Sequence, residues 1–264
     1  MKRAGIIWSW FWMLLGILYF FLPLLATFMF SLRGEIGHLG FKAYQNLFAD
    51  PRFLTDFFAS VMWALLTIAL SILLFVPTAY WVRLKLPGLR PYVEFVTLLP
   101  FVIPGIVYVF GLISTYSHPP LLIVDSPALL VAAYTILSMP YMYRSIDTGL
   151  QAIDVRTLTE AAQSLGAGWG TILFRVILPN IRVAILNGAF LSFAIVIGEY
   201  ILAQYLAKPA FAPYISLLIQ NKAYEPAAAT IISFILTWGC MGIIQYLGRG
   251  GNQAQIAGGR NSRS

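Results

Sequence analysis

Long apolar stretches separated by short polar segments dominate the chain. Six of them can cross a membrane as helices, because roughly 20 helical residues span the hydrocarbon layer. They cover residues 4–32, 57–82, 95–115, 126–143, 183–207 and 226–248. None alternates apolar and polar residues as outer-membrane strands do, and backbone amides in lipid must be satisfied within their own segment. The pattern predicts an all-α, polytopic membrane protein with six transmembrane helices.

Composition excludes a water-soluble globule. Hydrophobic residues make up 59% of the chain and charged residues 10%, against about 45–50% and about 25% in soluble domains. The formal net charge of +7 does not indicate a nucleic-acid partner, because the basic residues fall mainly in short loops between apolar stretches. The single cysteine, Cys240, excludes an internal disulfide.

The distribution of basic residues predicts the topology. Of the 17 Lys and Arg residues, twelve fall on the side that holds the N-terminus and five on the other, so both termini are predicted to be cytoplasmic. The first stretch is too long for a cleavable signal peptide. Residues 157–182 would then form a cytoplasmic loop. Residues 249–264 have little apolar content and are predicted to be a disordered cytoplasmic tail.

That cytoplasmic loop has the pattern of two short helices with a bend between them. Thr157 and Glu160 have the spacing of a capping box and predict a helix start. Gly166 can adopt the left-handed conformation that ends a helix. A second short helix is predicted from Trp169 onward, and Pro179 marks the entry into the fifth apolar stretch. By itself, the pattern is consistent with a connector that seals the inner face of the bundle.

The same residues match a family signature. Its spacing is EAA-x3-G-x9-[IV]-x-LP, and the matching residues are Glu160, Ala161, Ala162, Gly166, Leu178 and Pro179, with Val176 where the family more often has Ile. This pattern resembles the cytoplasmic loop of permease subunits of type I binding-protein-dependent ABC importers. The resemblance covers roughly residues 57–248 as the importer transmembrane domain, with residues 1–56 as an added first helix and outward loop.

In that family the loop docks on a separate ATP-hydrolysing subunit. The resemblance implies that the helix from Thr157 to Leu165 projects as a knob and that Gly166 forms its bend. Ala161 and Ala162 would keep the contact face small. It also implies a second permease subunit (a paralogue or an identical copy), two ATP-binding subunits and an extracytoplasmic solute-binding protein, assembled in a bacterial inner membrane.

Chemistry of its own is not expected from this chain. It contains no G-x-x-x-x-G-K-[ST] phosphate loop, so ATP and Mg are expected to be used by the partner subunit and no cofactor by this chain. His38 and His118 lie in separate loops without further ligand residues at metal-binding spacing, so no metal site is predicted. No nucleophile–base arrangement is apparent, which indicates a non-enzymatic protein.

Several residues within the apolar stretches are candidates for the translocation path. A carboxylate in a membrane costs about 2.5–3.5 kcal/mol, so Glu199 should face either a wet path or a neighbouring helix. Pro100 and Pro104 interrupt backbone hydrogen bonding and predict a kink. The kinked helix would either form part of a gate in the path or be a simple bend.

The fifth stretch also carries small residues on one helical face. Ala184, Gly188 and Ser192 recur at intervals of four and predict close helix packing. Asn187 lies on the same stretch and is suited to a hydrogen bond between helices.

The prediction of the substrate depends on resemblances of two short segments, which are weaker than the match of the loop signature. The segment LPFVIPGIV at 99–107 is most similar to the spermidine/putrescine permease branch, which implies polyamine transport; its relatives handle ferric iron or phosphonates. The segment IGEY at 197–200 instead resembles oxyanion permeases. A stand-alone, ion-coupled secondary transporter is the alternative of a different class, but it should show several intramembrane ionisable residues or inverted repeats.

Overall fold

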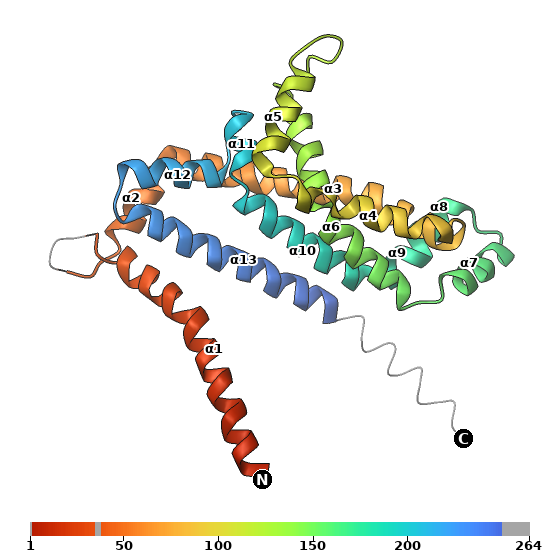
Figure 1. Ribbon diagram of the computed structural model, residues 1–264, viewed down its shortest axis with the longest axis horizontal. Helices are drawn as coiled ribbons and strands as arrows, with labels where there is room; N and C mark the ends of the chain where they lie inside the picture. Colours follow the sequence, from red (N-terminus) through yellow and green to blue (C-terminus); the bar gives the residue numbers. More distant parts are fainter. Residues whose placement is uncertain (1, 35–37, 250–264) are drawn as a thin grey trace. The chain divides into compact units, whose positions relative to one another are not determined.

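The computed structural model describes residues 2–34 and 38–249, which form helices joined by short loops. The elements in chain order are α1 (Lys2–Ser31), α2 (Lys42–Ala49), α3 (Pro51–Leu84), η1 (Pro87–Leu89), α4 (Arg90–Val102), α5 (Gly105–Tyr116), α6 (Pro127–Gln151), α7 (Val155–Ser164), α8 (Trp169–Thr171), η2 (Ile172–Ile177), α9 (Leu178–Asn180), α10 (Arg182–Gly198), α11 (Ile201–Tyr205), α12 (Phe211–Asn221) and α13 (Glu225–Arg249) (Figure 1). The all-α prediction is confirmed. Of the predicted tail, residues 250–264 lie outside the described residues.

Three helices are long and apolar enough to cross a membrane, in the segments Trp8–Ser31, Pro51–Leu84 and Glu225–Ile243. Two bent helix pairs raise the number to five if each pair is one span: Pro87–Val102 with Gly105–Tyr116, bent by 99°, and Trp169–Asn180 with Arg182–Gly198, bent by 77°. Helix α6 has 25 residues, but tyrosines, a proline and charged residues in its second half lower its hydropathy. The described residues thus contain three to five candidate spans, where the sequence pattern predicted six.

Contacts divide the chain into two units. The small unit comprises Met1–Thr55 and Tyr214–Trp238, and the large unit comprises Asp56–Pro213 and Gly239–Ser264. Within the small unit, the Asn46 amide donates to the Glu225 carboxylate at 3.0 Å and the Tyr214 hydroxyl donates to Asp50 at 2.9 Å. Most described side chains of α1 are apolar and exposed, as expected for a surface that meets lipid rather than water.

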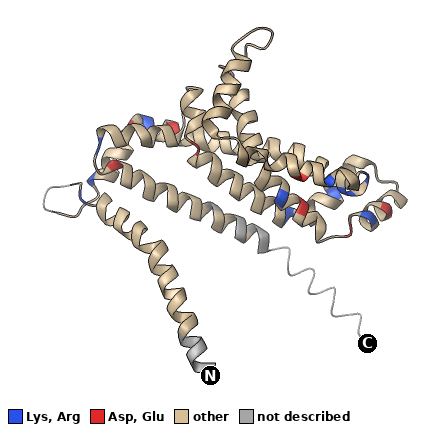
Figure 2. Cartoon of the chain, viewed as in Figure 1, with Lys and Arg blue, Asp and Glu red and all other residues tan. Residues whose placement is uncertain are grey.

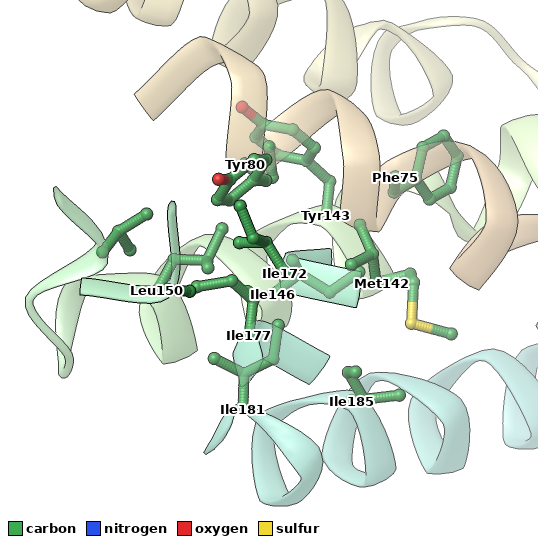
Figure 3. Packing of buried hydrophobic residues seen from close by; sticks show 14 residues of the cluster. Phe75, Tyr80, Met142, Tyr143, Ile146, Leu150, Ile172, Ile177, Ile181 and Ile185 are labelled. Atoms are coloured by element: carbon green, nitrogen blue, oxygen red, sulfur yellow. The ribbon is translucent and has the colours of Figure 1, made fainter. Parts of the chain in front are cut away.

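Within the large unit, α6 is the central helix, and its most extensive contact is with α10. A buried cluster joins α3, α6, α7 and the segment from η2 to α10. Figure 3 shows Tyr80 of α3, Ile146 of α6 and Ile172 of η2 within this cluster. Most of the charged residues of the unit gather around α7, α8 and the neighbouring ends of α3, α4 and α6, whereas the middles of α3 and α10 carry none (Figure 2). This core fixes the position of the loop between α6 and α10.

Candidate functional site

Helix α7 begins with a cap one turn earlier than the sequence pattern predicted. The Asp154 carboxylate accepts the backbone N–H of Thr157 at 3.1 Å and the Thr157 hydroxyl at 2.7 Å. Thr157 is therefore a residue of the first turn, and the prediction that it caps the helix together with Glu160 is wrong. Asp154 stands at the same three-residue spacing ahead of Thr157, and a carboxylate is a stronger acceptor than a hydroxyl.

The charges on the first turn of α7 are arranged around this cap. The hydrogen bonds from Thr157 lower the pKa of Asp154. Glu160 does not reach back to the helix start; it accepts a hydrogen bond from Arg156 Nε at 2.8 Å. Both partners of this pair are exposed, so the pair adds little stability in water and leaves Glu160 on the accessible surface.

Gly166 ends α7, as predicted. Its φ is +80°, the left-handed conformation that glycine adopts without steric penalty. The Gly166 N–H donates to Gln163 O at 2.9 Å, and the Ala167 N–H donates to Ala162 O at 3.0 Å. These two bonds form a Schellman motif. The motif reverses the chain and leaves Leu165 at the tip of the bend.

The chain returns to the membrane-crossing helix through an irregular helical segment. Helix α8 begins at Trp169, as predicted, and continues into η2, a π-helix. Pro179 lies inside α9, and the break before α10 falls at Ile181. A proline removes a backbone donor and crowds the preceding turn, which accounts for the widened turn before it.

One face of α7 is packed against the bundle. Val155, Thr159 and Ala162 are buried on this face, and the Thr159 hydroxyl lies 2.9 Å from the Tyr80 hydroxyl of α3. Ile172 of η2 is fully buried in the same cluster (Figure 3). The loop is therefore packed firmly against α3 and α6 of the large unit, at the helix ends that the sequence predicts to face the cytoplasm.

The opposite face of α7 is accessible. Glu160 and Ala161 are exposed, and the apolar Leu165 is 89% exposed. Ala162 is only 8% exposed, so the expectation that both alanines keep the contact face small is wrong for Ala162. Successive helical residues are about 100° apart, and Ala162 shares the face of Val155 and Thr159.

Trp169 forms a second accessible feature beside α7. Its ring lies 4.7 Å from that of Trp81, between centroids, and the Lys85 ammonium lies 6.0 Å from its centroid. A partly exposed aromatic ring that contacts a second ring and lies beside a cation is a stable surface element.

A partly buried ion-pair cluster, which the sequence pattern did not predict, holds three helices together at the same end of the unit. The Asp147 carboxylate of α6 contacts Arg83 of α3 at 3.2 Å and Arg90 of α4 at 3.0 Å. It also accepts from the Gln151 amide at 2.6 Å. Asp147 is buried, so removing either arginine would leave its charge with fewer partners. The only sequence signal was a carboxylate near the end of an apolar stretch.

Glu199, a predicted path residue, caps the short helix α11. Its carboxylate accepts the backbone N–H of Leu202 at 2.9 Å and 3.0 Å through its two oxygens, and that of Ala203 at 3.3 Å. The Tyr134 hydroxyl of α6 is close enough to interact electrostatically with this carboxylate but has no hydrogen-bond partner among the described residues. These bonds favour the interpretation that Glu199 organises neighbouring backbone.

The two prolines of the third apolar stretch have different effects. Pro100 lies inside α4, whereas Pro104 stands at the break between α4 and α5. Gly105 then lies against α11: a Cβ atom added there would be 3.2 Å from Ile201 Cδ1. The bend and the helix capped by Glu199 are therefore in contact.

The small-residue stripe of α10 lies against α6. A Cβ atom added at Gly188 would come within 2.7 Å of Met142 Sδ, and one added at Gly149 within 2.5 Å of the Ala184 Cβ atom. Ser192 is fully buried. Such close approach needs small side chains on both helices.

Residues 87–247 match the family described as "Binding-protein-dependent transport system inner membrane component". This is more than half of the chain, and it contains the whole segment from α7 to α10.

Curated relatives and a solved structure extend the match. The chain is 28% identical to the probable sulfate transport system permease protein cysT of Chlorokybus atmophyticus, over 86% of this chain and 84% of that protein. It is 30% identical to the molybdenum transport system permease protein ModB of Mycobacterium bovis, over 70% of each. Its fold is similar to a chain of a bacterial ABC transporter that imports alginate, with a TM-score of 0.70, 18% identity and coverage of 95% and 97%.

Proposed function

Because the chain belongs to the family of binding-protein-dependent transport system inner membrane components, we propose that it forms half of the translocation path of an ATP-driven solute importer. Under this proposal, the loop from Thr157 to Pro179 couples it to a separate ATPase subunit. The chain is a multi-pass permease of the inner membrane and not an enzyme.

The two-faced structure of α7 is the observation that carries the coupling role. Its buried face is fixed to α3 by the Tyr80–Thr159 contact at 2.9 Å, whereas Leu165 projects at the Gly166 bend with 89% of its surface exposed. Covering an apolar side chain by a partner removes it from water and lowers the free energy of the complex. A firmly attached helix then transmits a push on its outer face to the bundle.

The proposed complex contains two ATP-binding subunits, a second permease subunit and an extracytoplasmic solute-binding protein. The absence of a phosphate-loop motif from the sequence supports placing ATP and Mg in the partner subunit, with no cofactor on this chain. In this arrangement, the excess of basic residues on one side supports cytoplasmic termini and a cytoplasmic α7. Residues 57–248 would form the importer transmembrane domain.

Glu199, Pro100 and Pro104 are proposed to shape the path indirectly. Glu199 fixes the first turn of α11, and α11 contacts α5 just after the Pro104 break. A movement of α5 would therefore displace α11, and a movement of α11 would displace α5. Ala184, Gly188 and Ser192 provide the close packing through which α10 carries motion from the loop.

An oxyanion is the proposed substrate class. The sulfate and molybdenum permeases named above support this class, which agrees with the resemblance of the IGEY segment. They do not support the polyamine assignment implied by LPFVIPGIV. A ferric-ion substrate is the second candidate, since a putative ferric permease of Haemophilus influenzae is 32% identical over 38% of this chain.

Uptake and ATP hydrolysis by the reconstituted complex test this function. The wild-type complex should take up radiolabelled sulfate or molybdate only with ATP and the solute-binding protein. Leu165→Asp should reduce uptake at least tenfold, because a charge replaces the apolar docking residue, while the amount of permease in the membrane stays constant. Leu86→Asp is the matched control, since Leu86 is an exposed leucine outside the loop.

Two outcomes would contradict the proposal. One is uptake by this chain alone, driven by an ion gradient and indifferent to ATP, which is the behaviour of a secondary transporter. The other is equal uptake by Leu165→Asp and wild type, which would remove the loop from the coupling.

A further inference from the structure

A pocket of about 410 Å³, with several polar residues in its lining, lies between α4, α6 and α10 in the large unit. Its polar lining includes Tyr141, Arg144 and Ser145 of α6 and Asn187 of α10. Its other walls are largely apolar, and none of the described residues that line it is an Asp or Glu. The pocket therefore offers hydrogen-bond donors and a positive charge without a competing carboxylate.

Arg144 differs from the arginines near it. Arg83 and Arg90 both contact Asp147, one helical turn further along α6. Arg144 is exposed and lines the pocket. Across residues 2–34 and 38–249, its guanidinium has no ion-pair or hydrogen-bond partner. The Arg144 guanidinium is therefore free to contact a ligand that enters the pocket.

Asn187 is the second unusual residue of the pocket. The sequence suited it to a hydrogen bond between helices, yet its side chain is exposed and lines the pocket with Arg144. The close α6–α10 packing at Gly188 fixes the spacing between these two polar side chains. The site is thus held by backbone packing and not by a flexible loop.

We propose that this pocket is a contact site for the transported oxyanion, with the Arg144 guanidinium as its charge and Asn187, Ser145 and Tyr141 as neutral donors. This inference rests on the proposed function. The planar guanidinium presents paired N–H groups that match a tetrahedral oxyanion. One positive charge does not neutralise a dianion, so the contact is weak enough for the ion to leave, as a transport path requires.

A lipid phosphate shares this chemistry, because it is also a tetrahedral oxyanion. The two sources differ in their dependence on the membrane. A transported ion should occupy the pocket in a bilayer of neutral phosphatidylcholine, whereas a headgroup site would need an anionic lipid such as phosphatidylglycerol.

Charge substitution in the complete importer tests the site. Arg144→Gln should lower sulfate or molybdate uptake at least tenfold, and Arg144→Lys should retain an intermediate rate, while ATP hydrolysis stimulated by the loaded binding protein persists. Arg182→Gln, which removes an exposed arginine outside the pocket, should transport like wild type. Equal uptake by Arg144→Gln and wild type overturns the site. Failure of the wild-type complex to take up either ion instead overturns the oxyanion function, and the site with it.

A second measurement does not depend on the activity of the arginine variant. With Cys240→Ser removing the single native cysteine, Asn187→Cys should react with a thiol reagent in the complex reconstituted in phosphatidylcholine nanodiscs. Sulfate or molybdate should slow that reaction at least threefold. Absence of protection overturns the proposal, as does protection by phosphatidylglycerol in place of the free ion.

Discussion

Asp154 and Glu199 cap short helices by the same contact in two different regions. Each carboxylate accepts the backbone N–H three residues ahead, at 3.1 Å from Thr157 for Asp154 and at 2.9 Å from Leu202 for Glu199. Asp154 stands in an exposed polar loop. Glu199 is half-buried between apolar helices, and Leu202 and Ala203, whose amides it accepts, are fully buried.

The surroundings decide what each cap contributes. Water can replace the carboxylate of Asp154 as an acceptor, so loss of that cap mainly loosens the helix start. Leu202 and Ala203 are fully buried, so loss of Glu199 would leave their amide groups without an acceptor. The same contact thus stabilises the first turn of an exposed helix in one region and satisfies buried backbone amides in the other.

Removing the Glu199 cap should have the largest effect. Each unsatisfied buried amide costs about 1–3 kcal/mol, so Glu199→Ala should clearly lower the melting temperature of the purified permease. Glu199→Gln keeps one acceptor oxygen and should lower it less. Glu160→Ala is the control, because it removes an exposed carboxylate. Equal decreases of the melting temperature for Glu199→Ala and Glu160→Ala would contradict the claim that the Glu199 cap contributes more to stability than an exposed carboxylate does.

Changing the other end of α7 should affect coupling more than stability. Gly166 has open space around its Cα hydrogen but a φ of +80°, so a substitution acts through backbone conformation, at about 1–2 kcal/mol. Gly166→Val should reduce the solute carried per ATP hydrolysed, whereas Gly166→Asn, which tolerates this conformation, should largely retain it. Identical ratios for the two variants would show that the bend is not needed.

Removing the exposed cap should have the smallest effect. Asp154→Ala should speed hydrogen exchange in the first turn of α7, and Asp154→Asn should restore protection. The pKa of Asp154 is lowered in the folded chain, so its contribution is present above the ordinary value of about 3.9 and is lost as pH falls through the lowered value. Exchange in wild type should therefore be protected at pH 5, and loss of protection there would contradict the role of the cap.

The sequence predicted the features that depend on local rules. Apolar stretches indicated the helices, and Gly166 indicated the end of α7, because each depends on a few consecutive residues. Pro104 likewise indicated the bend after α4. The break at Ile181 was missed, because Pro179 stays within a helical turn and displaces the break by two residues.

Features that depend on three-dimensional neighbours could not be predicted in the same way. The orientation of Ala162 toward the bundle depends on which face of α7 packs against α3, the face that also carries Val155 and Thr159. The Asp147 cluster joins a residue of α6 to two arginines about 60 positions earlier in the sequence, on α3 and α4. Nothing local distinguishes the paired Arg83 from the unpaired Arg144.

Crosslinking from adjacent residues of α7 tests the central claim most directly. Ala161 is exposed and Ala162 is buried against the bundle, so single cysteines at these positions, in a Cys240→Ser background, differ in face but hardly in sequence position. In the assembled complex, Ala161→Cys should crosslink to the ATPase subunit and Ala162→Cys should not. Failure of Ala161→Cys to capture that subunit, or equal capture from both positions, would contradict the account.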